Sequence, residues 1–583
     1  MSTAGLSGLI PLAIAIPITG AVLAPLLARI SKRAPLAVCI AATAASGAIL
    51  LLMAPKVYGG YEITHFLGHW APFSGHQLGD TLVVDPFGLT FALAVAGLGT
   101  ILLVYSLSEL PGLGARELGM YACLFELLLA ALIGSALTAD LVNLFVWFEV
   151  AALACYGLAG FFLERPIALE ATFKTLVLTN MAGFVVFIGA AMIYSNHGAL
   201  NFGQIHHALV THVGRADVVA FGLLLMGFAT KAGIMPFHGW LPDAHTAAPG
   251  PVSALFSGLM VDLGTVAIAR LSLQVYGHTS ARPILGLLTV LGCVSAVLGA
   301  VLALAQDDLK RLLAYDTISQ MGILLVGFAT GSAEGIAGAV YHLISHGFFK
   351  VLLFLCAGAI VHATGLTKLS DMGGLARRMP IIATAFVFGA AAIAGIPPFN
   401  GYVSLSLIHD SLQDHNPVAF AIVIVAQIIT VAALARATYL AFFRSRPQPQ
   451  KDLEPLHPGM IVGLAILSVA CVATGVLAYP MLHHIAEPAA GGLLDPTRYA
   501  NGALSAGANL VVPHVSFSFF SPSGLATSLG TVAAGLLLSW VYVKRPEPKP
   551  VSWLRAAHNG SVNDYASYFA AGGVITIVVL LAR

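Results

Sequence analysis

Apolar residues recur along nearly the whole chain in stretches of about 20, separated by short polar segments. A stretch of this length crosses the hydrocarbon core of a bilayer as one α-helix. The pattern predicts an all-α polytopic membrane protein of about 14–16 transmembrane helices. Sixteen spans fit it: 6–30, 34–53, 83–106, 118–137, 140–162, 169–194, 217–239, 251–276, 283–304, 311–329, 335–363, 380–408, 417–443, 458–480, 523–543 and 563–582.

Composition supports this interpretation, because hydrophobic residues make up 58% of the 583 residues and charged residues only 9%. A soluble protein of this length needs far more charge on its surface. The net charge of +1 does not indicate a nucleic-acid partner. The longer polar segments, 54–82 and 481–522, are too short for a catalytic domain.

Lysine and arginine are distributed unevenly between the two sides of the predicted membrane. Loops after odd-numbered spans contain Arg29, Lys32, Arg33, Arg116, Arg165, Lys310, Arg311, Lys368, Arg377, Arg378, Arg444, Arg446, Lys451, Lys544, Arg545, Lys549 and Arg555. The other side has only Lys56, Arg215, Arg282, Arg498 and Arg583. Basic loops face the cytoplasm. We therefore expect a multi-pass protein of a bacterial-type inner membrane, with both termini outside and a first span that is not a cleaved signal peptide.

Binding motifs for metals and cofactors are missing from the sequence. The six cysteines lie singly inside spans, without a C-x-x-C pair, which argues against a disulfide frame, a zinc site or an iron–sulfur cluster. No P-loop or dinucleotide fingerprint occurs. We expect no metal and no cofactor bound by this chain, so that its energy source belongs to a partner subunit.

Two spans are interrupted by proline. "KAGIMPFHGWLPDAHTAAPGP" contains Pro236, and "AGIPPFNGYVS" contains Pro397 and Pro398. Proline removes a helix hydrogen bond, and such breaks persist in a membrane only where protein or a polar cavity satisfies the backbone. The breaks lie five spans apart, which predicts two five-helix units with inverted topology. The alternative to a repeat is that two unrelated helix kinks occur at these positions by coincidence. The expected regions are 1–117, 118–276 (first repeat), 283–443 (second repeat) and 444–583.

Charged and titratable side chains lie inside the predicted spans, although each costs about 2.5–3.5 kcal/mol at the bilayer centre. Candidates for a proton pathway are Glu149, Lys174, Lys231, His238, His342, His346 and Lys350. Candidate modulators are Glu126, Asp262, Asp316 and His409. Burial brings lysine and glutamate toward titration near neutral pH, so a Glu–Lys pair can act as a proton switch.

One helix carries His342, His346 and Lys350 at four-residue spacing, so each step climbs about 6 Å along one face. With bridging water this row is suited to proton relay. Sodium would prefer clustered carboxylates, which are sparser here. The structural alternative is that these groups form static ion pairs between helices. For His238 and His245, the structural alternative is that they form hydrogen bonds with backbone groups that the helix break leaves unpaired.

Several motifs resemble the antiporter-like proton-translocating membrane subunits of respiratory complex I, Mrp antiporters and group 4 hydrogenases of the hydrogenase-4 and formate hydrogenlyase type. They are "KAGIMPFHGWLPDAHTAAPGPVSAL", "LALAQDDLKRLLAYDTISQMG", "YHLISHGFFKVLLFLCAGAIVHATG" and "GGLARRMP…AGIPPFNGYVS". The resemblance covers roughly residues 80–445. "GIPPFNGYVS" is most similar to the hydrogenase-type branch, and "LRAAHNGSVNDYASY" to the longer, terminal type of subunit.

The resemblance implies two inverted repeats with a broken helix each, and proton translocation driven by redox chemistry in other subunits. By motif, Glu149 matches the glutamate that pairs with the broken-helix lysine, Lys231. Lys174 matches the lysine of the next helix. Lys350 matches the central lysine of the second repeat, and the two preceding histidines match those leading to it.

The chain departs from the family pattern at three positions. Asp262 stands where many members have lysine, and Asp316 stands where serine is common. Leu405 replaces the lysine or glutamate usual in the second broken helix; His409, one turn later, is the available substitute. The segment 544–562 is also too short for the lateral helix of long members.

Three functional hypotheses follow. The first is a proton-translocating subunit of a complex I-related assembly of the NADH:quinone oxidoreductase or membrane hydrogenase type. Its partners would be other membrane and peripheral subunits, the lipid bilayer and protons. The second is the proton-conducting subunit of an inorganic-carbon (CO₂/bicarbonate) uptake complex with a zinc partner protein. The third is a non-conducting scaffold, which Leu405 favours and the intact first half opposes.

Overall fold

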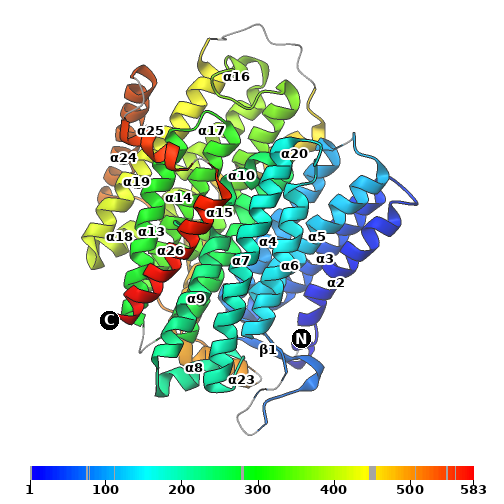
Figure 1. Cartoon of the computed structure of the whole chain (residues 1–583), viewed down its shortest axis with the longest axis vertical. Helices are drawn as coiled ribbons and strands as arrows, with labels where there is room; N and C mark the ends of the chain where they lie inside the picture. Colours follow the sequence, from blue (N-terminus) through cyan, green and yellow to red (C-terminus); the bar gives the residue numbers. More distant parts are fainter. Residues whose placement is uncertain are drawn as a thin grey trace.

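The computed structural model is a bundle of long helices (Figure 1). It describes residues 3–582 except 74–76, 78, 111, 278–280, 446–454, 506, 546–548 and 559. Within these residues, 14 helices are long and apolar enough to cross a membrane. They coincide with fourteen of the sixteen predicted spans. The two others, 217–239 and 380–408, are the interrupted spans. The fold class is confirmed. Most of the predicted loop 444–457 lies outside the described residues.

The N-terminal region contains two helices, a small hairpin and a third long helix. Its elements are α1 (Thr3–Ser7), α2 (Ile10–Leu27), α3 (Ala34–Val57), β1 (Ile63–Phe66), the 3₁₀ turn η1 (Leu67–His69), β2 (Thr81–Val84) and α4 (Pro86–Glu109). β1 and β2 pair antiparallel, with Ile63 opposite Val84. Asp85 caps α4 by accepting from the Gly88 N–H at 3.2 Å, and proline follows at the first helical position.

The first broken helix and its neighbours follow. These elements are α5 (Ala115–Leu137), α6 (Leu141–Ala159), α7 (Pro166–His197), α8 (Phe202–Thr211), α9 (Arg215–Ala232), α10 (Leu241–Ala247), α11 (Gly250–Leu255), the π-helical turn η2 (Phe256–Met260), α12 (Val261–Ala269) and the π-helical turn η3 (Arg270–Val275). The membrane-spanning run from α11 to η3, Gly250–Val275, is buried inside the bundle along its most apolar stretch.

The next segment contains the second broken helix. Its elements are α13 (Ala281–Leu304), α14 (Leu309–Ala329), α15 (Ala333–Thr364), α16 (Leu375–Arg378), α17 (Pro380–Ile393), α18 (Asn400–His415), α19 (Pro417–Thr438) and the π-helical turn η4 (Tyr439–Phe443). α15 is 32 residues long, as is α7. Ser332 caps α15 by accepting from the Gly335 N–H.

The remaining elements pack around these helices. They are α20 (Pro458–Val476), α21 (Ala478–Met481), the π-helical turn η5 (Leu482–Ala486), α22 (Glu487–Leu494), α23 (Pro496–Leu504), α24 (Pro522–Lys544), α25 (Lys549–Ala557) and α26 (Val562–Leu581). α24 packs on α19, and α26 packs on α9 and α13. Between α24 and α26, the described residues form one helix, the nine-residue α25. Both termini lie toward the end of the molecule that carries β1 and α8 (Figure 1).

The two predicted polar segments form one cap at that end. The Glu62 N–H donates to the Ala508 carbonyl at 2.9 Å, and the Thr64 hydroxyl donates to the Gly502 carbonyl at 2.8 Å. Beneath them, Arg270 of η3 donates to Asp85 at 2.8 Å. The hairpin and α23 are thereby tied to the ends of α4 and η3.

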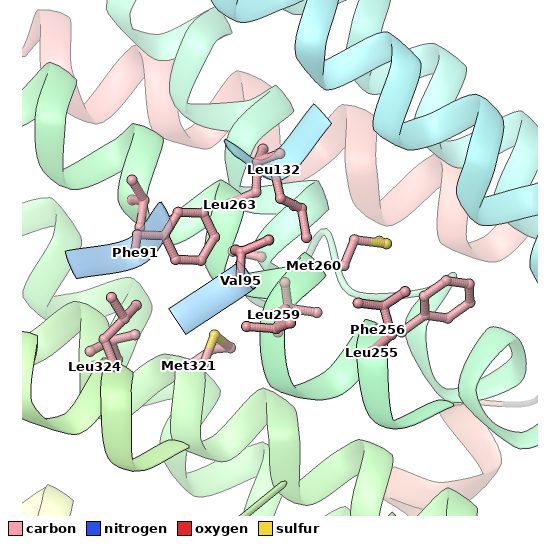
Figure 2. Close-up of a cluster of buried hydrophobic side chains, with 14 of the residues drawn as sticks. Phe91, Val95, Leu132, Leu255, Phe256, Leu259, Met260, Leu263, Met321 and Leu324 are labelled. Carbon is pink, nitrogen blue, oxygen red and sulfur yellow. The ribbon is translucent and has the colours of Figure 1, made fainter. Parts of the chain in front are cut away.

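An apolar cluster joins the centre of the bundle (Figure 2). Phe91 and Val95 of α4 and Leu132 of α5 meet the run from Leu255 to Leu263, and α14 adds Met321 and Leu324. These side chains are almost fully buried. The helices that carry Asp262 and Asp316, α12 and α14, therefore pack against α4 and α5 through this cluster.

Both interruptions have the same local form. α9 ends at Gly233 (φ 69°), and α17 is followed by Gly395 (φ 70°). These left-handed conformations favour glycine. Each break contains a cis prolyl bond, at Pro236 and at Pro398. Side chains from other helices bond the freed backbone: Ser295 accepts from the Met235 N–H at 2.9 Å, and Ser528 of α24 donates to the Gly395 carbonyl at 2.6 Å.

Candidate functional site

Lys231 and Glu149 lie on α9 and α6, near the first break. Lys231 is fully buried, its ammonium has no hydrogen-bond partner, and it lies 4.7 Å from the centre of the Phe148 ring. Glu149 Oε1 is also buried without a partner. No ion pair within 4.0 Å joins these two described residues. The expected Glu–Lys pair is therefore open, and a cation–π contact holds the lysine instead.

Lys174 of α7 belongs to an ion-pair network. Its ammonium lies 2.5 Å from Glu170 and 2.8 Å from Asp243 of α10, and Asp243 is also 3.2 Å from Arg311 of α14. Asp243 follows the first break, so the break is tied to both α7 and α14.

His238 lies inside the first break, against the C-terminal region. Its ring centre is 5.1 Å from that of His558 and 5.9 Å from that of Tyr565. Both ring nitrogens of His238 are buried without hydrogen-bond partners. The alternative that His238 bonds freed backbone stays open, because its ring also interacts with the backbone of Pro236. Burial lowers the pKa of His558, which follows the short surface helix α25.

The row on α15 meets three different helices. Lys350 is fully buried; it donates to Asp316 of α14 at 2.5 Å and to the Leu313 carbonyl at 3.1 Å. His346 Nδ1 faces Asp262 of α12 at 3.4 Å. The ring centres of His342 and His346 are 6.5 Å apart. Two expected modulators, Asp262 and Asp316, are thus direct partners of the row.

His342 extends the row to the second broken helix. Its Nδ1 lies 3.0 Å from the hydroxyl of Ser404 on α18. Since a hydroxyl both donates and accepts, this contact can pass a proton in either direction. The sequence-based reasoning missed Ser404, although it stands directly before Leu405.

Leu405 itself is packed in a second apolar cluster, where Ile408 and Leu412 of α18 meet α13, α14 and α19. One side of it borders a cavity of about 10 Å³, which is room for about one water. His409 and Asp410 also line this cavity, as does Ser528 of α24. His409 is 7% exposed and has an unpartnered Nε2.

Glu126 is separated from the rest of the candidate set. Both of its carboxylate oxygens accept from the Thr43 hydroxyl at 2.8 Å, so it faces α3 of the N-terminal region. No contact in the described part of the chain joins it to the row on α15. It stays a candidate modulator with a separate location.

Known proteins resemble this chain over most of its length. The family model for the transmembrane region of NADH:quinone oxidoreductases and Mrp antiporters matches residues 138–430. NADH-quinone oxidoreductase subunit N of Desulforudis audaxviator is 31% identical over 496 residues, covering 82% of this chain and 97% of that protein. The chain belongs to this family. Hydrogenase-4 component B of Escherichia coli is 30% identical over 437 residues, covering 70% of this chain and 64% of that protein.

Solved structures agree with the assignment to this family. A chain of the Mrp complex from Dietzia sp. has a TM-score of 0.77 at 26% identity, covering 86% of this chain and 100% of that one. A chain of the membrane-bound sulfane sulfur reductase, an archaeal respiratory membrane complex, has a TM-score of 0.77 at 25% identity, covering 86% of this chain and 99% of that one. Members of the NADH:quinone oxidoreductase/Mrp antiporter family are thus similar to this chain over most of its length.

Within this family fold, the structure adds polar groups that sequence reasoning did not select. Asp243 bonds Lys174, and the buried Arg270–Asp85 pair lies under the cap with the fully buried Glu62. Burial, followed by the charge of Asp85, raises the pKa of Glu62 well above its usual value. No cluster of three or more potential metal ligands occurs among the described residues. The described cysteines are free and mostly buried.

Proposed function

We propose that this chain translocates protons as an antiporter-like subunit of a complex I-related membrane assembly. The observation that carries the proposal is the row His342–His346–Lys350, in which every member faces a titratable or hydroxyl partner on a different helix. A side chain that only forms a static salt bridge needs a single partner. A row that continues through Asp316, Asp262 and Ser404 supplies acceptors and donors in sequence.

The open arrangement of Lys231 and Glu149 supports their role as the input switch. When the carboxylate approaches the ammonium, the pair favours both charged forms; when it withdraws, the lysine favours release of its proton. Phe148 provides an alternative partner for the cation, so Lys231 is held while the switch is open. Lys174 would modulate the Glu149–Lys231 switch through its ion pair with Asp243.

The two halves are proposed to be inverted repeats, residues 118–276 and 283–443. Asp140 caps α6, and its backbone forms a bridge with Asn201 after α7; Asp308 caps α14, and its backbone bridges Lys368 after α15. The first bridge lies next to β2, because Asn201 donates to the Thr81 hydroxyl at 3.1 Å, and the second includes Lys368, which precedes α16. β1, the partner strand of β2, and α16 lie at opposite ends of the bundle (Figure 1). This matches the expectation for inverted copies.

The second half would release protons through His409. Its cavity has room for about one water between the broken helix and α24, and His409, Asp410 and Tyr402 are titratable groups in its lining. Leu405 forms one wall of the same cavity, which supports a route past this residue. This contact weakens the scaffold hypothesis, since Leu405 was its main support.

The orientation and partners are part of the proposal. The basic loops would face the cytoplasm of a bacterial cell, placing both termini outside. Peripheral subunits would supply the redox energy. Copurification of an iron–sulfur or nickel protein supports this assembly, whereas a zinc-bound, carbonic-anhydrase-like partner would favour the inorganic-carbon alternative.

The test is proton transport by the intact complex in sealed membrane vesicles. Lys231→Ala and Glu149→Gln are each expected to lower the initial rate of ΔpH formation by about 10²-fold or more, the contribution typical of a positioned proton-transfer group. Glu164→Gln, an exposed carboxylate, is the control. Wild-type rates in both variants would rule out the proposal.

A further inference from the structure

A cavity of about 250 Å³ lies between the N-terminal helices and α20, and none of the proton-pathway residues lines it. Its walls come from the connection between α2 and α3, the end of α4, the first turn of α5 and the residue that caps α20. The chain begins at the end of the bundle that carries β1 (Figure 1), and α2 crosses the bundle. The connection after α2 therefore lies at the opposite, basic end, at the level of the lipid headgroups.

The side chains that line this cavity are basic, hydroxyl-bearing or apolar. Lys32 and Arg33 supply two positive charges, and His457 adds an imidazole. Within the described part of the chain, no carboxylate belongs to the lining. Glu117 stands close by in the first turn of α5, but its Oε2 accepts from the Gly114 N–H at 2.7 Å and so caps its own helix. A lining of this composition is complementary to an anion, and to a phosphate group above all.

Ser108 is a buried polar group in the wall of the cavity. It is 7% exposed, and its hydroxyl has no hydrogen-bond partner among the described residues. The next residue, Glu109, lines a different cavity of about 320 Å³ and accepts from the Gly250 N–H at 3.2 Å. A buried hydroxyl that lines a cavity and lacks a protein partner is suited to donate to an oxygen of a bound anion.

The start of α20 contributes a second donor. His457 Nδ1 accepts from the Gly459 N–H at 3.3 Å, so the neutral imidazole carries its proton on Nε2. His457 caps α20, and the N-terminus of this helix adds partial positive charge to the same wall. A Cβ at Gly459 would collide with the Ser108 hydroxyl oxygen. This glycine therefore lets α20 approach α4 closely and brings the two donors into one cavity.

An exposed apolar stripe leads from the cavity along α4. Leu107 lines the cavity and is 36% exposed, and Val104, one turn before it, is 40% exposed. Gly97, two turns further along the same face, has open space where a Cβ would be. A free phosphate ion makes no use of such a stripe, whereas the acyl chains of a phospholipid gain by lying along it. The stripe therefore favours a lipid over a free anion.

We propose that this cavity binds the headgroup of an anionic phospholipid, whose acyl chains lie along the exposed stripe of α4. Lys32 and Arg33 pair with the phosphate, and Ser108 and His457 donate to its oxygens. Basic pockets between membrane helices bind anionic headgroups through the same chemistry. The bound lipid joins the connection between α2 and α3 to α20, two regions far apart in sequence. This inference does not depend on proton transport by the chain.

The test measures how fast a thiol in the cavity wall is modified. Ser108→Cys replaces the hydroxyl with a thiol, and Thr367→Cys places one on the exposed connection after α15, on the same side. The intact complex is placed in nanodiscs of phosphatidylcholine, or of an equimolar mixture with phosphatidylglycerol, and treated with the neutral reagent N-ethylmaleimide. Phosphatidylglycerol is expected to slow modification at position 108 at least about tenfold and to leave position 367 unchanged. Leu107→Cys on the same wall replaces Ser108→Cys if that variant does not assemble.

Two further arms identify the bound group. Lys32→Gln/Arg33→Gln in the Ser108→Cys background is expected to abolish the protection, whereas Lys544→Gln/Arg545→Gln, which removes two exposed charges on the same side, retains it. Excess inorganic phosphate in phosphatidylcholine nanodiscs should leave the rate at position 108 unchanged. Protection by inorganic phosphate alone would identify a free-anion site and overturn the lipid proposal. Equal rates in the two kinds of nanodisc, or no reaction in either, would overturn it as well.

Discussion

At the scale of single residues, the two buried lysines of the proposed pathway have different neighbours. Lys350 meets Asp316 and Lys231 meets the face of Phe148, so the two lysines have different environments. The carboxylate of Asp316 neutralises the charge of Lys350, whereas Lys231 has only the face of an aromatic ring, a contact of about 2 kcal/mol or more when desolvated. Lys231 is therefore the lysine that a moving carboxylate can most easily control.

The pair of Lys350 and Asp316 gives a prediction that separates stability from transport. Asp316→Asn leaves a buried ammonium without its counter-charge, which costs roughly 3–5 kcal/mol. We expect a lower Tm in the purified complex and loss of ΔpH formation. The double variant Asp316→Asn/Lys350→Met removes both charges, so its Tm should recover substantially while transport stays absent. A double variant as unstable as Asp316→Asn alone would contradict this account.

At the scale of elements, one close helix contact shapes the geometry of the site. α12 carries Asp262 and packs on α9, which carries Lys231. At Gly264 the two backbones nearly touch: a Cβ there would lie 2.4 Å from the Phe228 carbonyl oxygen and 2.5 Å from the Ala232 nitrogen. Hydropathy places both helices in the membrane, but only this small residue allows them to approach so closely.

Gly264→Ala is expected to separate α9 from α12, with a destabilisation of about 1–3 kcal/mol from overpacking. The relation of Lys231 to Asp262 would change, so proton transport should fall with the Tm. Gly97→Ala on α4 is the matched control, because its Cβ meets nothing within 4 Å. Equal transport rates and equal Tm values in the two variants would show that the close approach is unimportant.

At the scale of the whole molecule, the extra C-terminal helices complete both halves. α26 covers α9 and the first break, where Tyr565 and His558 meet His238, and α24 supplies Ser528 to the second break. The cap of β1, β2, α22 and α23 covers the end of the bundle opposite α16. Each half is thus sealed by segments distant in sequence.

The proposed orientation predicts where a C-terminal reporter is active. Alkaline phosphatase fused after Leu581 should be active, because it folds only outside the cytoplasm, and a green fluorescent protein at the same position should be dark. Fusions after Arg444 should give the reverse, since this arginine follows an odd-numbered span on the basic side. If the C-terminal green fluorescent protein fusion is fluorescent and the C-terminal phosphatase fusion is inactive, the molecule has the opposite orientation.

The sequence by itself determined the approximate positions of the spans, the two breaks and part of the set of buried titratable residues. These follow from local rules: helix length matches bilayer thickness, proline interrupts a helix, and a charge in an apolar span is costly. The termini on one side of the bundle also follow from an even number of spans.

Only the tertiary structure decided which residues meet. It placed Asp316 on Lys350 and Asp262 on His346, left Glu149 apart from Lys231, moved Glu126 to α3 and opened a cavity at Glu109. Hydropathy cannot supply these contacts, because lipid and protein interior are equally apolar and leave no periodic mark on a helix buried on all sides. Close packing sets the rotation of each helix about its own axis, and this rotation decides which side chains meet.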